Sequence, residues 1–204
     1  MILIVDYGMG NVRSLKNAFD FLGHDAILSR EIEDFERAER IVLPGVGAFG
    51  DAINSIRSLG LEDVLWKQAI EVKKPIFGIC LGMQLIASSS SEYGNHNGLS
   101  WIEADVIPMI GSHADKVPHV GWNSINITRD EWLFDGLPSN PDFYFVHSFY
   151  MKCHNQNNVI ATTQHNGIIT AAVAQENIVA TQFHPEKSQD NGLQILQNWL
   201  DRDF

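Results

Sequence analysis

Short apolar runs alternate with segments of helical spacing over the first ninety residues of the chain. Ile2–Val5 is a run of the kind that lies inside a parallel sheet, and runs at 26–28, 41–43 and 75–79 predict further strands. Between them, the spacing of the apolar positions predicts helices over residues 12–22, 49–59 and 61–72. This rhythm of strand and helix predicts a parallel sheet covered by helices.

Strand-like segments dominate the second half of the chain. They cover residues 102–107, 122–127, 143–151, 159–163, 168–174 and 178–183. The pair Asn166-Gly167 is typical of a hairpin turn, so we expect these later strands to be largely antiparallel. A helix over 192–201 closes the pattern. We therefore predict an α/β fold with a central mixed, mostly parallel sheet flanked by helices and with antiparallel strands in the second half.

Composition and charge narrow the class of protein. The 204 residues contain no linker-like stretch, so we expect one domain spanning residues 1–204. The formal net charge of −11 argues against a nucleic-acid or anionic-membrane surface. No run approaches the roughly 20 apolar residues of a membrane span, and the first residues lack the basic region of a signal peptide. With only Cys80 and Cys153, in unrelated contexts, a reducing cytoplasm is the expected location.

The sharpest local pattern surrounds Cys80, in the segment Gly78-Ile79-Cys80-Leu81-Gly82. The segment follows a predicted strand and precedes a helix expected over 83–87, which is the context of a nucleophile elbow with cysteine in place of serine. Glycines are needed on both sides because a side chain there would crowd the neighbouring strand or helix. The following helix would favour the thiolate, and the Leu81 amide could donate to an oxyanion. The alternative is a buried structural cysteine.

A cysteine nucleophile needs a base that the fold brings close to it. Among eight histidines, only His184 ends an apolar strand and is followed at once by Pro185 and Glu186. Glu186 can fold back through the Pro185 turn and accept a hydrogen bond from the imidazole, which would fix its tautomer. The alternative is an ordinary surface turn. Cys153 has no comparable context, and we interpret it as structural.

The two motifs together resemble the class I glutamine amidotransferases. Gly-x-Cys-x-Gly is followed about a hundred residues later by Phe-His-Pro-Glu. The resemblance implies the fold of that family and a triad carried here by Cys80, His184 and Glu186. It further implies that L-glutamine forms a glutamyl thioester as ammonia leaves, and that water then hydrolyses the thioester. No cofactor is expected.

Within that family, the chain resembles the glutaminase subunits of imidazole glycerol phosphate synthases nearly from end to end. The segments that carry this likeness are residues 5–11, 43–49, 118–123, 144–148 and 184–188. The resemblance implies a heterodimer with a (β/α)₈ cyclase subunit, which receives the ammonia through an internal passage. The products would be imidazole glycerol phosphate and an aminoimidazole carboxamide nucleotide, in histidine and purine metabolism.

The resemblance also implies roles for single residues. The oxyanion would be held by the amides of Val46, Gly47 and Leu81. Glutamine would be contacted by Gly45, Gln84, Glu92 and Ser148. The cyclase would contact Asn11, Trp122, Asn123 and Lys187. Without the resemblance, Asn11 would be interpreted as a helix cap, Trp122 as a core aromatic and Lys187 as a solvated charge. The glycines of the Gly45–Gly47 loop would let its peptide reorient, and we expect the isolated chain to be a poor glutaminase.

Four alternatives remain open from the residues. The segment 93–106 departs from the usual histidine-pathway pattern, so the ammonia could instead amidinate a cell-surface sugar. A cysteine peptidase or deglycase would not need Gln84 or the Gly45–Gly47 loop. A regulatory subunit without chemistry would not need an intact triad. A metal site using His113 and His119, or His147 and His154, would lack a flanking cysteine or carboxylate at ligand spacing.

Overall fold

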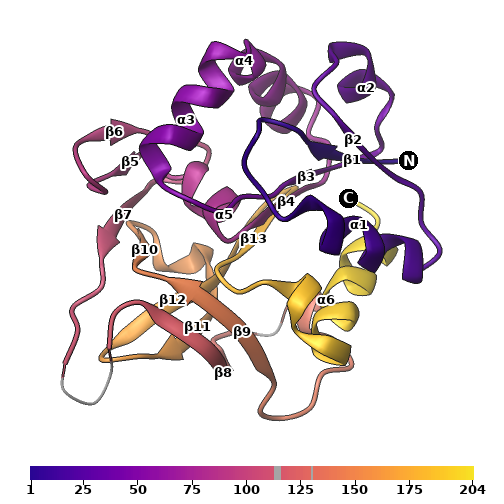
Figure 1. Cartoon of the computed structure of the whole chain (residues 1–204). Helices are drawn as coiled ribbons and strands as arrows, with labels where there is room; N and C mark the ends of the chain where they lie inside the picture. Colours follow the sequence, from indigo (N-terminus) through magenta and orange to yellow (C-terminus); the bar gives the residue numbers. More distant parts are fainter. Residues whose placement is uncertain (113–115, 130) are drawn as a thin grey trace.

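The computed structural model describes residues 1–112, 116–129 and 131–204. A nine-stranded sheet crosses the molecule in the order β2-β1-β3-β4-β13-β12-β11-β8-β9 (Figure 1). Its parallel half contains β1 (Ile2–Val5), β2 (Ala26–Ser29), β3 (Arg40–Leu43), β4 (Ile76–Ile79) and β13 (Ile178–Thr181). Its antiparallel half contains β12 (Ile168–Gln175), β11 (Val159–Gln164), β8 (His119–Ile127) and β9 (Asp142–His147). The predicted mixed α/β sheet is confirmed.

A second sheet of four strands lies beside the first, in the order β10-β7-β5-β6. Its strands are β10 (Phe149–Cys153), β7 (Ala104–Pro108), β5 (Ser89–Ser90) and β6 (His96–Asn97). The prediction of one strand over 143–151 is therefore wrong. The chain leaves the first sheet after His147 and enters the second at Phe149, so Ser148 marks the crossing between them.

Helices cover both faces of the parallel half of the large sheet, where β1 and β4 are buried along their whole length. On β1, Leu3 and Val5 pack with α3 (Phe49–Ser58), α4 (Leu61–Trp66) and α5 (Leu81–Leu85). Ile2 and Ile4 face the opposite layer, where α1 (Val12–Phe21) and α6 (Gln189–Asp201) pack. Figure 1 shows these two groups of helices on either side of the strands. The period of two along β1 thus assigns alternate side chains to separate cores.

The remaining elements are short. They are α2 (Ile32–Arg37), the π-helical turn η1 (Lys67–Glu71), and the 3₁₀ turns η2 (Trp132–Phe134), η3 (Gln156–Asn158) and η4 (Pro185–Lys187). Helix α2 was not predicted, and the helix expected over 61–72 is an α-helix that continues as η1. No helix among the described residues is long and apolar enough to cross a membrane.

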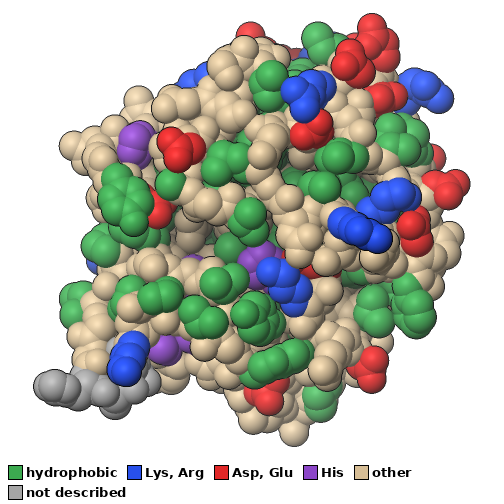
Figure 2. Space-filling model, viewed as in Figure 1, with side chains coloured by type: hydrophobic (Ala, Val, Ile, Leu, Met, Phe, Trp, Pro, Cys, Tyr) green, Lys and Arg blue, Asp and Glu red, His purple; other side chains and the backbone are tan. Residues whose placement is uncertain are grey.

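The carboxyl ends of β1, β3, β4 and β13 meet at one edge of the large sheet, because these neighbouring strands are parallel. This edge carries the Gly45–Gly47 loop, Cys80 and His184. On the face drawn in Figure 2, hydrophobic side chains and histidines gather around a hollow. Ligands of open α/β sheets bind at this kind of edge.

Candidate active site

Cys80 lies on a sharp turn between β4 and α5, with φ 54° and ψ −107°. Few residues other than glycine adopt a positive φ, and such strain is found where a side chain must be held for function. A Cβ on Gly82 would overlap the carbonyl oxygen of Leu43, and a Cβ on Gly78 would lie 3.0 Å from the Cβ of Ala180. The crowding inferred from the sequence is therefore present on both sides of Cys80.

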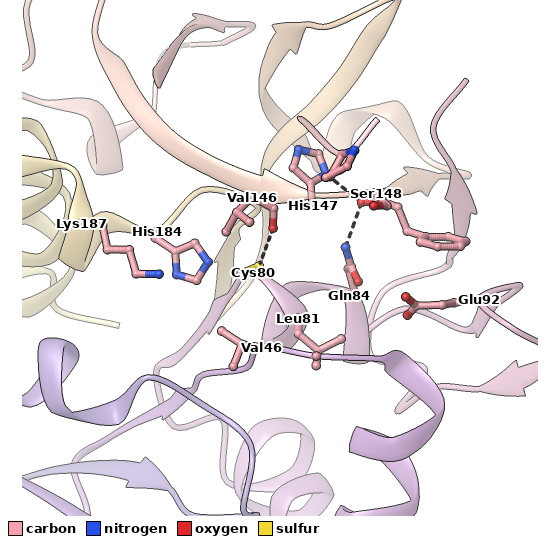
Figure 3. A pocket seen from close by; sticks show the side chains of 13 residues that line it. Val46, Cys80, Leu81, Gln84, Glu92, Val146, His147, Ser148, His184 and Lys187 are labelled. Atoms are coloured by element: carbon pink, nitrogen blue, oxygen red, sulfur yellow. Dashed lines mark hydrogen bonds between the residues drawn. The ribbon is translucent and has the colours of Figure 1, made fainter. Parts of the chain in front are cut away.

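His184 reaches Cys80 because their strands are neighbours. Strand β13 pairs in parallel with β4, with Thr181 opposite Ile79. The chain emerging from β13 therefore passes beside the Cys80 turn, and Figure 3 shows the His184 ring next to the Cys80 sulfur. The triad that the resemblance implied is thus brought together from two strand ends.

Glu186 sets the tautomer of His184. The Nδ1 of His184 lies 2.8 Å from Oε1 of Glu186, and the two side chains are only 2% and 4% exposed. Because a carboxylate can only accept, Nδ1 carries the hydrogen. Nε2 of His184 is buried without a hydrogen-bond partner among the described residues, so it is the nitrogen available for proton exchange with Cys80.

The charges around His184 favour its protonated form. Burial lowers the pKa of His184, but its interactions with Cys80 and Glu186 outweigh burial and raise the pKa to about 9. At neutral pH the imidazole is therefore protonated, and it can stabilise a thiolate at Cys80 by an ion pair.

A cavity of about 390 Å³ opens over Cys80 and His184, which is within the range of small-molecule sites. The predicted site residues that line it are Val46, Gly47, Cys80, Leu81, Gln84, Glu92, Ser148, His184 and Lys187. Figure 3 shows Glu92 and His184 on opposite sides of Cys80. The cavity thus has the Glu92 carboxylate at one end and Cys80 with His184 at the other.

The Leu81 amide is engaged by the protein. Its N–H donates to the Gly45 carbonyl, with the two heavy atoms 3.4 Å apart. The hydroxyl of Tyr7 holds the loop at this point by donating to the Pro44 carbonyl at 2.5 Å. It lies so close to Gly45 that a Cβ there would overlap it. Val46, in contrast, is exposed. Leu81 can therefore donate to an oxyanion only after the Gly45 carbonyl has turned away.

Gln84 and Glu92 are both fixed by hydrogen bonds. The Nε2 of Gln84 donates to the Phe149 carbonyl and to Oε1 of Gln182, each at 3.0 Å. Both of its hydrogens are used, so the side-chain oxygen is the group of Gln84 left for a ligand. The Oε2 of Glu92 accepts from the Phe49 N–H at 2.7 Å. The other carboxylate oxygen of Glu92 remains for a cation.

The four residues expected at the partner interface differ in their surroundings. Trp122 is 49% exposed, so it is not the core aromatic that the sequence alone suggested, and its ring meets that of Tyr144 at 6.3 Å. The Lys187 ammonium lies 5.7 Å from the same tyrosine ring. Asn11 occupies the N-cap position of α1, but its side chain donates to Ser14 and does not cap the helix. Asn123 donates to the Gln164 carbonyl at 2.8 Å.

Two histidines considered above as metal ligands are buried here, and one of them, His147, lines the cavity. The Nδ1 of His147 donates to the Phe149 carbonyl at 2.8 Å, so its Nε2 accepts from Nδ1 of His119, 3.0 Å away. Burial, with a smaller contribution from nearby histidines, lowers the pKa of His147 to about 3, which keeps it neutral. His147 continues the alternation of buried side chains along β9, after Phe143 and Phe145. This alternation is the sequence signal that could have predicted its burial.

The histidine pairs considered as metal ligands have other partners here. His154 lies 2.7 Å from Asp105, and His119 is bonded to His147. His113 lies outside the described residues. Within the described residues, no group of three or more histidine, cysteine or acidic side chains is arranged to hold a metal ion.

The chain matches the family described as Glutamine amidotransferase class-I over residues 3–202. It is similar to the imidazole glycerol phosphate synthase subunit HisH 2 of Nitrobacter winogradskyi, with 44% identity over 98% of this chain and 97% of that protein. It is also similar to HisH 2 of Methanococcus maripaludis, with 42% identity over 98% of both chains. For the HisH subunit of Sulfurimonas denitrificans, the identity is 44% over 98% of this chain and 97% of that protein.

Solved structures share the fold. A crystal structure of a glutamine amidotransferase superposes with a TM-score of 0.74 at 22% identity, covering 98% of this chain and 99% of that one. The structure of PurLQS from Thermotoga maritima superposes with a TM-score of 0.73 at 18% identity, covering 98% of this chain and 97% of the matched one. Family match, similar relatives and fold agree with the resemblance found in the sequence. The chain belongs to the class I glutamine amidotransferase family.

Proposed function

We propose that this chain is the glutaminase subunit of an imidazole glycerol phosphate synthase. It hydrolyses L-glutamine to glutamate and ammonia and supplies the ammonia to a cyclase partner for histidine biosynthesis. The observation that carries the proposal is the buried arrangement of Cys80, His184 and Glu186 at one cavity, in a chain related over its whole length to HisH subunits.

The chemistry follows from the protonation states. The Cys80 thiolate attacks the carboxamide carbon of glutamine, and the His184 imidazolium gives its proton to the departing ammonia. This leaves a glutamyl thioester and a neutral imidazole. Water then attacks the thioester carbon while His184 takes up the proton of that water, which releases glutamate and restores the thiolate–imidazolium pair. Glu186 keeps Nδ1 protonated throughout, so Nε2 is always the nitrogen that exchanges.

The cavity supports an orientation for glutamine. The free carboxylate oxygen of Glu92 and the side-chain oxygen of Gln84 would accept from the α-ammonium group of the substrate. The carboxamide would then extend to Cys80, where Val46 and Gly47 would border the reacting carbon; Gly45 is buried and is not among the residues that line the cavity. Ser148 lines the wall between the two ends.

The partner would be a (β/α)₈ cyclase that covers the mouth of the cavity. Exposed Trp122 and half-buried Lys187, which both contact the Tyr144 ring, would provide an aromatic and a cationic contact, with Asn11 and Asn123 in the same interface. Docking would also have a catalytic role, because the Gly45 carbonyl must leave the Leu81 amide before the oxyanion can be bound. Val46 and Gly47 would move with it. We place this assembly in the cytoplasm.

Labelling of Cys80 by an electrophilic glutamine analogue tests the glutaminase site. The purified chain is treated with a diazoketone analogue of glutamine, and the labelled cysteine is identified by peptide mass spectrometry. We expect label on Cys80, protection by glutamine and no protection by asparagine. Cys153→Ala should label normally and Cys80→Ala should not. Labelling of Cys80 at the same rate with and without glutamine would contradict a glutamine pocket.

A further inference from the structure

Gln182 is a completely buried polar residue beside the nucleophile. It follows β13 and precedes Phe183 and His184, and its backbone N–H donates to the Ala171 carbonyl at 2.8 Å. Its side-chain Nε2 lies 3.8 Å from the sulfur of Cys80, and its Oε1 accepts from Gln84 at 3.0 Å. The triad chemistry above makes no use of this amide, although it contacts a reacting atom.

The direction of these hydrogen bonds is set by one backbone carbonyl. The carbonyl of Phe149 can only accept, so it faces the nitrogen of Gln84 and not its oxygen. The second hydrogen of the same nitrogen then points at Gln182, which must present its oxygen there. The amide nitrogen of Gln182 is therefore the end that faces the sulfur.

The reversed orientation of Gln182 is unfavourable at both ends. It would place two NH₂ groups against each other at the Gln84 contact and leave a buried donor unsatisfied, which costs about 1–3 kcal/mol. It would also direct a carbonyl oxygen at the sulfur, which a thiolate would repel. Gln84 thus holds the Gln182 amide in the orientation that donates to Cys80.

Besides His184, the sulfur of Cys80 has one further donor and one acceptor beside it. The Val146 carbonyl, 3.9 Å away, accepts from the protonated thiol, whereas the Gln182 amide donates and so favours the thiolate. Hydrogen bonds to an ionised acceptor are stronger than those to a neutral one. The gain from Gln182 therefore increases when the proton leaves the sulfur.

We propose that Gln182 is a further catalytic residue of this glutaminase, whose side-chain amide donates to the sulfur of Cys80 and stabilises it as a thiolate. The assignment rests on the proposed function. Sulfur is anionic before attack and again when the thioester is hydrolysed, so one donor assists formation of the nucleophile and departure of the sulfur. Gln84 is the positioning residue for this donor, in addition to its place in the glutamine cavity.

The pH dependence of Cys80 alkylation by iodoacetamide tests the proposal on the full chain. Alkylation follows the thiolate, and mass spectrometry separates Cys80 from Cys153. Gln182→Met has no side-chain donor, so we expect the pH midpoint of Cys80 alkylation to rise by about one unit. Below the midpoint, alkylation should then be about tenfold slower than in the wild type. The limiting rate at high pH should be unchanged. Gln84→Met, which frees the amide to rotate, should shift the midpoint in the same direction.

Thr181→Val is the matched structural control. Thr181 precedes Gln182 and is equally buried. Its hydroxyl donates to the Phe183 carbonyl and not to the sulfur, so the substitution removes one buried hydrogen bond without removing a donor to Cys80. The pH midpoint of Cys80 alkylation in Thr181→Val should equal that of the wild type. If Gln182→Met does not fold, Gln182→Glu keeps the shape and the acceptor for Gln84 but places a carboxylate at the sulfur, so its midpoint should rise further.

An unchanged midpoint in a folded Gln182 variant would overturn the proposal. An equal shift in Thr181→Val would overturn it too, because the shift would then report a general loosening of the site. Alkylation needs no glutamine turnover, so this result stands apart from the proposed function. Failure of the proposed function would instead appear as wild-type Cys80 that glutamine does not protect from the diazoketone.

Discussion

His184 and Glu186 form a buried pair in which Nδ1 and Oε1 lie 2.8 Å apart. The pair is local, because Pro185 starts the η4 turn that folds Glu186 back towards the ring. Cys80, in contrast, comes from about a hundred residues earlier and reaches the pair only through the parallel pairing of β4 with β13. The contact between His184 and Glu186 is thus specified by a short motif, whereas the position of both residues relative to Cys80 depends on the whole sheet.

The raised pKa of His184 makes stability fall at alkaline pH. The pKa is about 9 in the folded chain, against 6.5 for an unperturbed histidine. The interactions of the imidazolium therefore stabilise the fold fully below pH 6.5 and are lost as the pH rises through about 9. Urea unfolding of the wild type and of His184→Gln at a series of pH values tests this loss of stability. The urea concentration at half-unfolding should decline between pH 6.5 and about 9 in the wild type and not in His184→Gln. Parallel pH profiles for the two proteins would contradict the assignment.

The glycines beside Cys80 should differ in their tolerance of alanine. A Cβ at Gly82 would overlap severely with a backbone atom, the Leu43 carbonyl oxygen, whereas the nearest atoms to a Cβ at Gly78, among them the Cβ of Ala180, would lie 3.0–3.1 Å away. Overpacking a core typically lowers the free energy of unfolding by roughly 1–3 kcal/mol. We expect Gly82→Ala to lower it by about 3 kcal/mol or more, and Gly78→Ala to lower it by less. Gly10→Ala, whose nearest neighbour would be 3.4 Å away, is the control. Urea unfolding measures all three variants, and a Gly82→Ala variant as stable as the wild type would contradict the crowding at this turn.

Trp122 should contribute to partner binding and not to folding. It is 49% exposed and contacts Tyr144 at the face that carries Lys187. Trp122→Ala should weaken binding to the cyclase subunit by at least tenfold, in the manner of an aromatic hot spot worth about 2 kcal/mol. The urea midpoint should be nearly unchanged.

Trp66→Ala provides the matched control for this measurement. Trp66 is 46% exposed, and its helix α4 contributes no residue to the cavity over Cys80. Isothermal titration calorimetry of each variant with the cyclase subunit compares the two. Equal losses of affinity in both variants would contradict the location of the interface.

The sequence predicted those elements whose signals are local. Ile2–Val5 was predicted with its observed bounds because four consecutive apolar residues are buried on both faces of a parallel sheet. Asn166 and Gly167 both have positive φ in the turn between β11 and β12, as the hairpin pattern requires. Helix α2 was missed because its six residues bury only Phe35 and so carry almost no apolar periodicity.

Features that depend on tertiary contacts were not predictable in the same way. The break at Ser148 is invisible in the apolar run from 143 to 151, because the strands on either side of it have the same pattern although they belong to different sheets. Gln182 gave no signal because its role depends on Gln84 and Cys80, which are distant in the chain. The engagement of the Leu81 amide by Gly45 is likewise a property of the folded loop.

Glutamate release from glutamine tests most directly whether this chain is a glutaminase gated by its partner. It would be measured for the purified chain alone, with the cyclase-like protein encoded nearest to it, and with that protein and its nucleotide ligand, using Cys80→Ala and Cys153→Ala as controls. We predict slow release by the chain alone, at least tenfold stimulation by partner and nucleotide together, and no release by Cys80→Ala. Full activity of the isolated chain would contradict the gating by the Gly45 carbonyl, and the absence of release under every condition with Cys80 intact would contradict the glutaminase assignment itself.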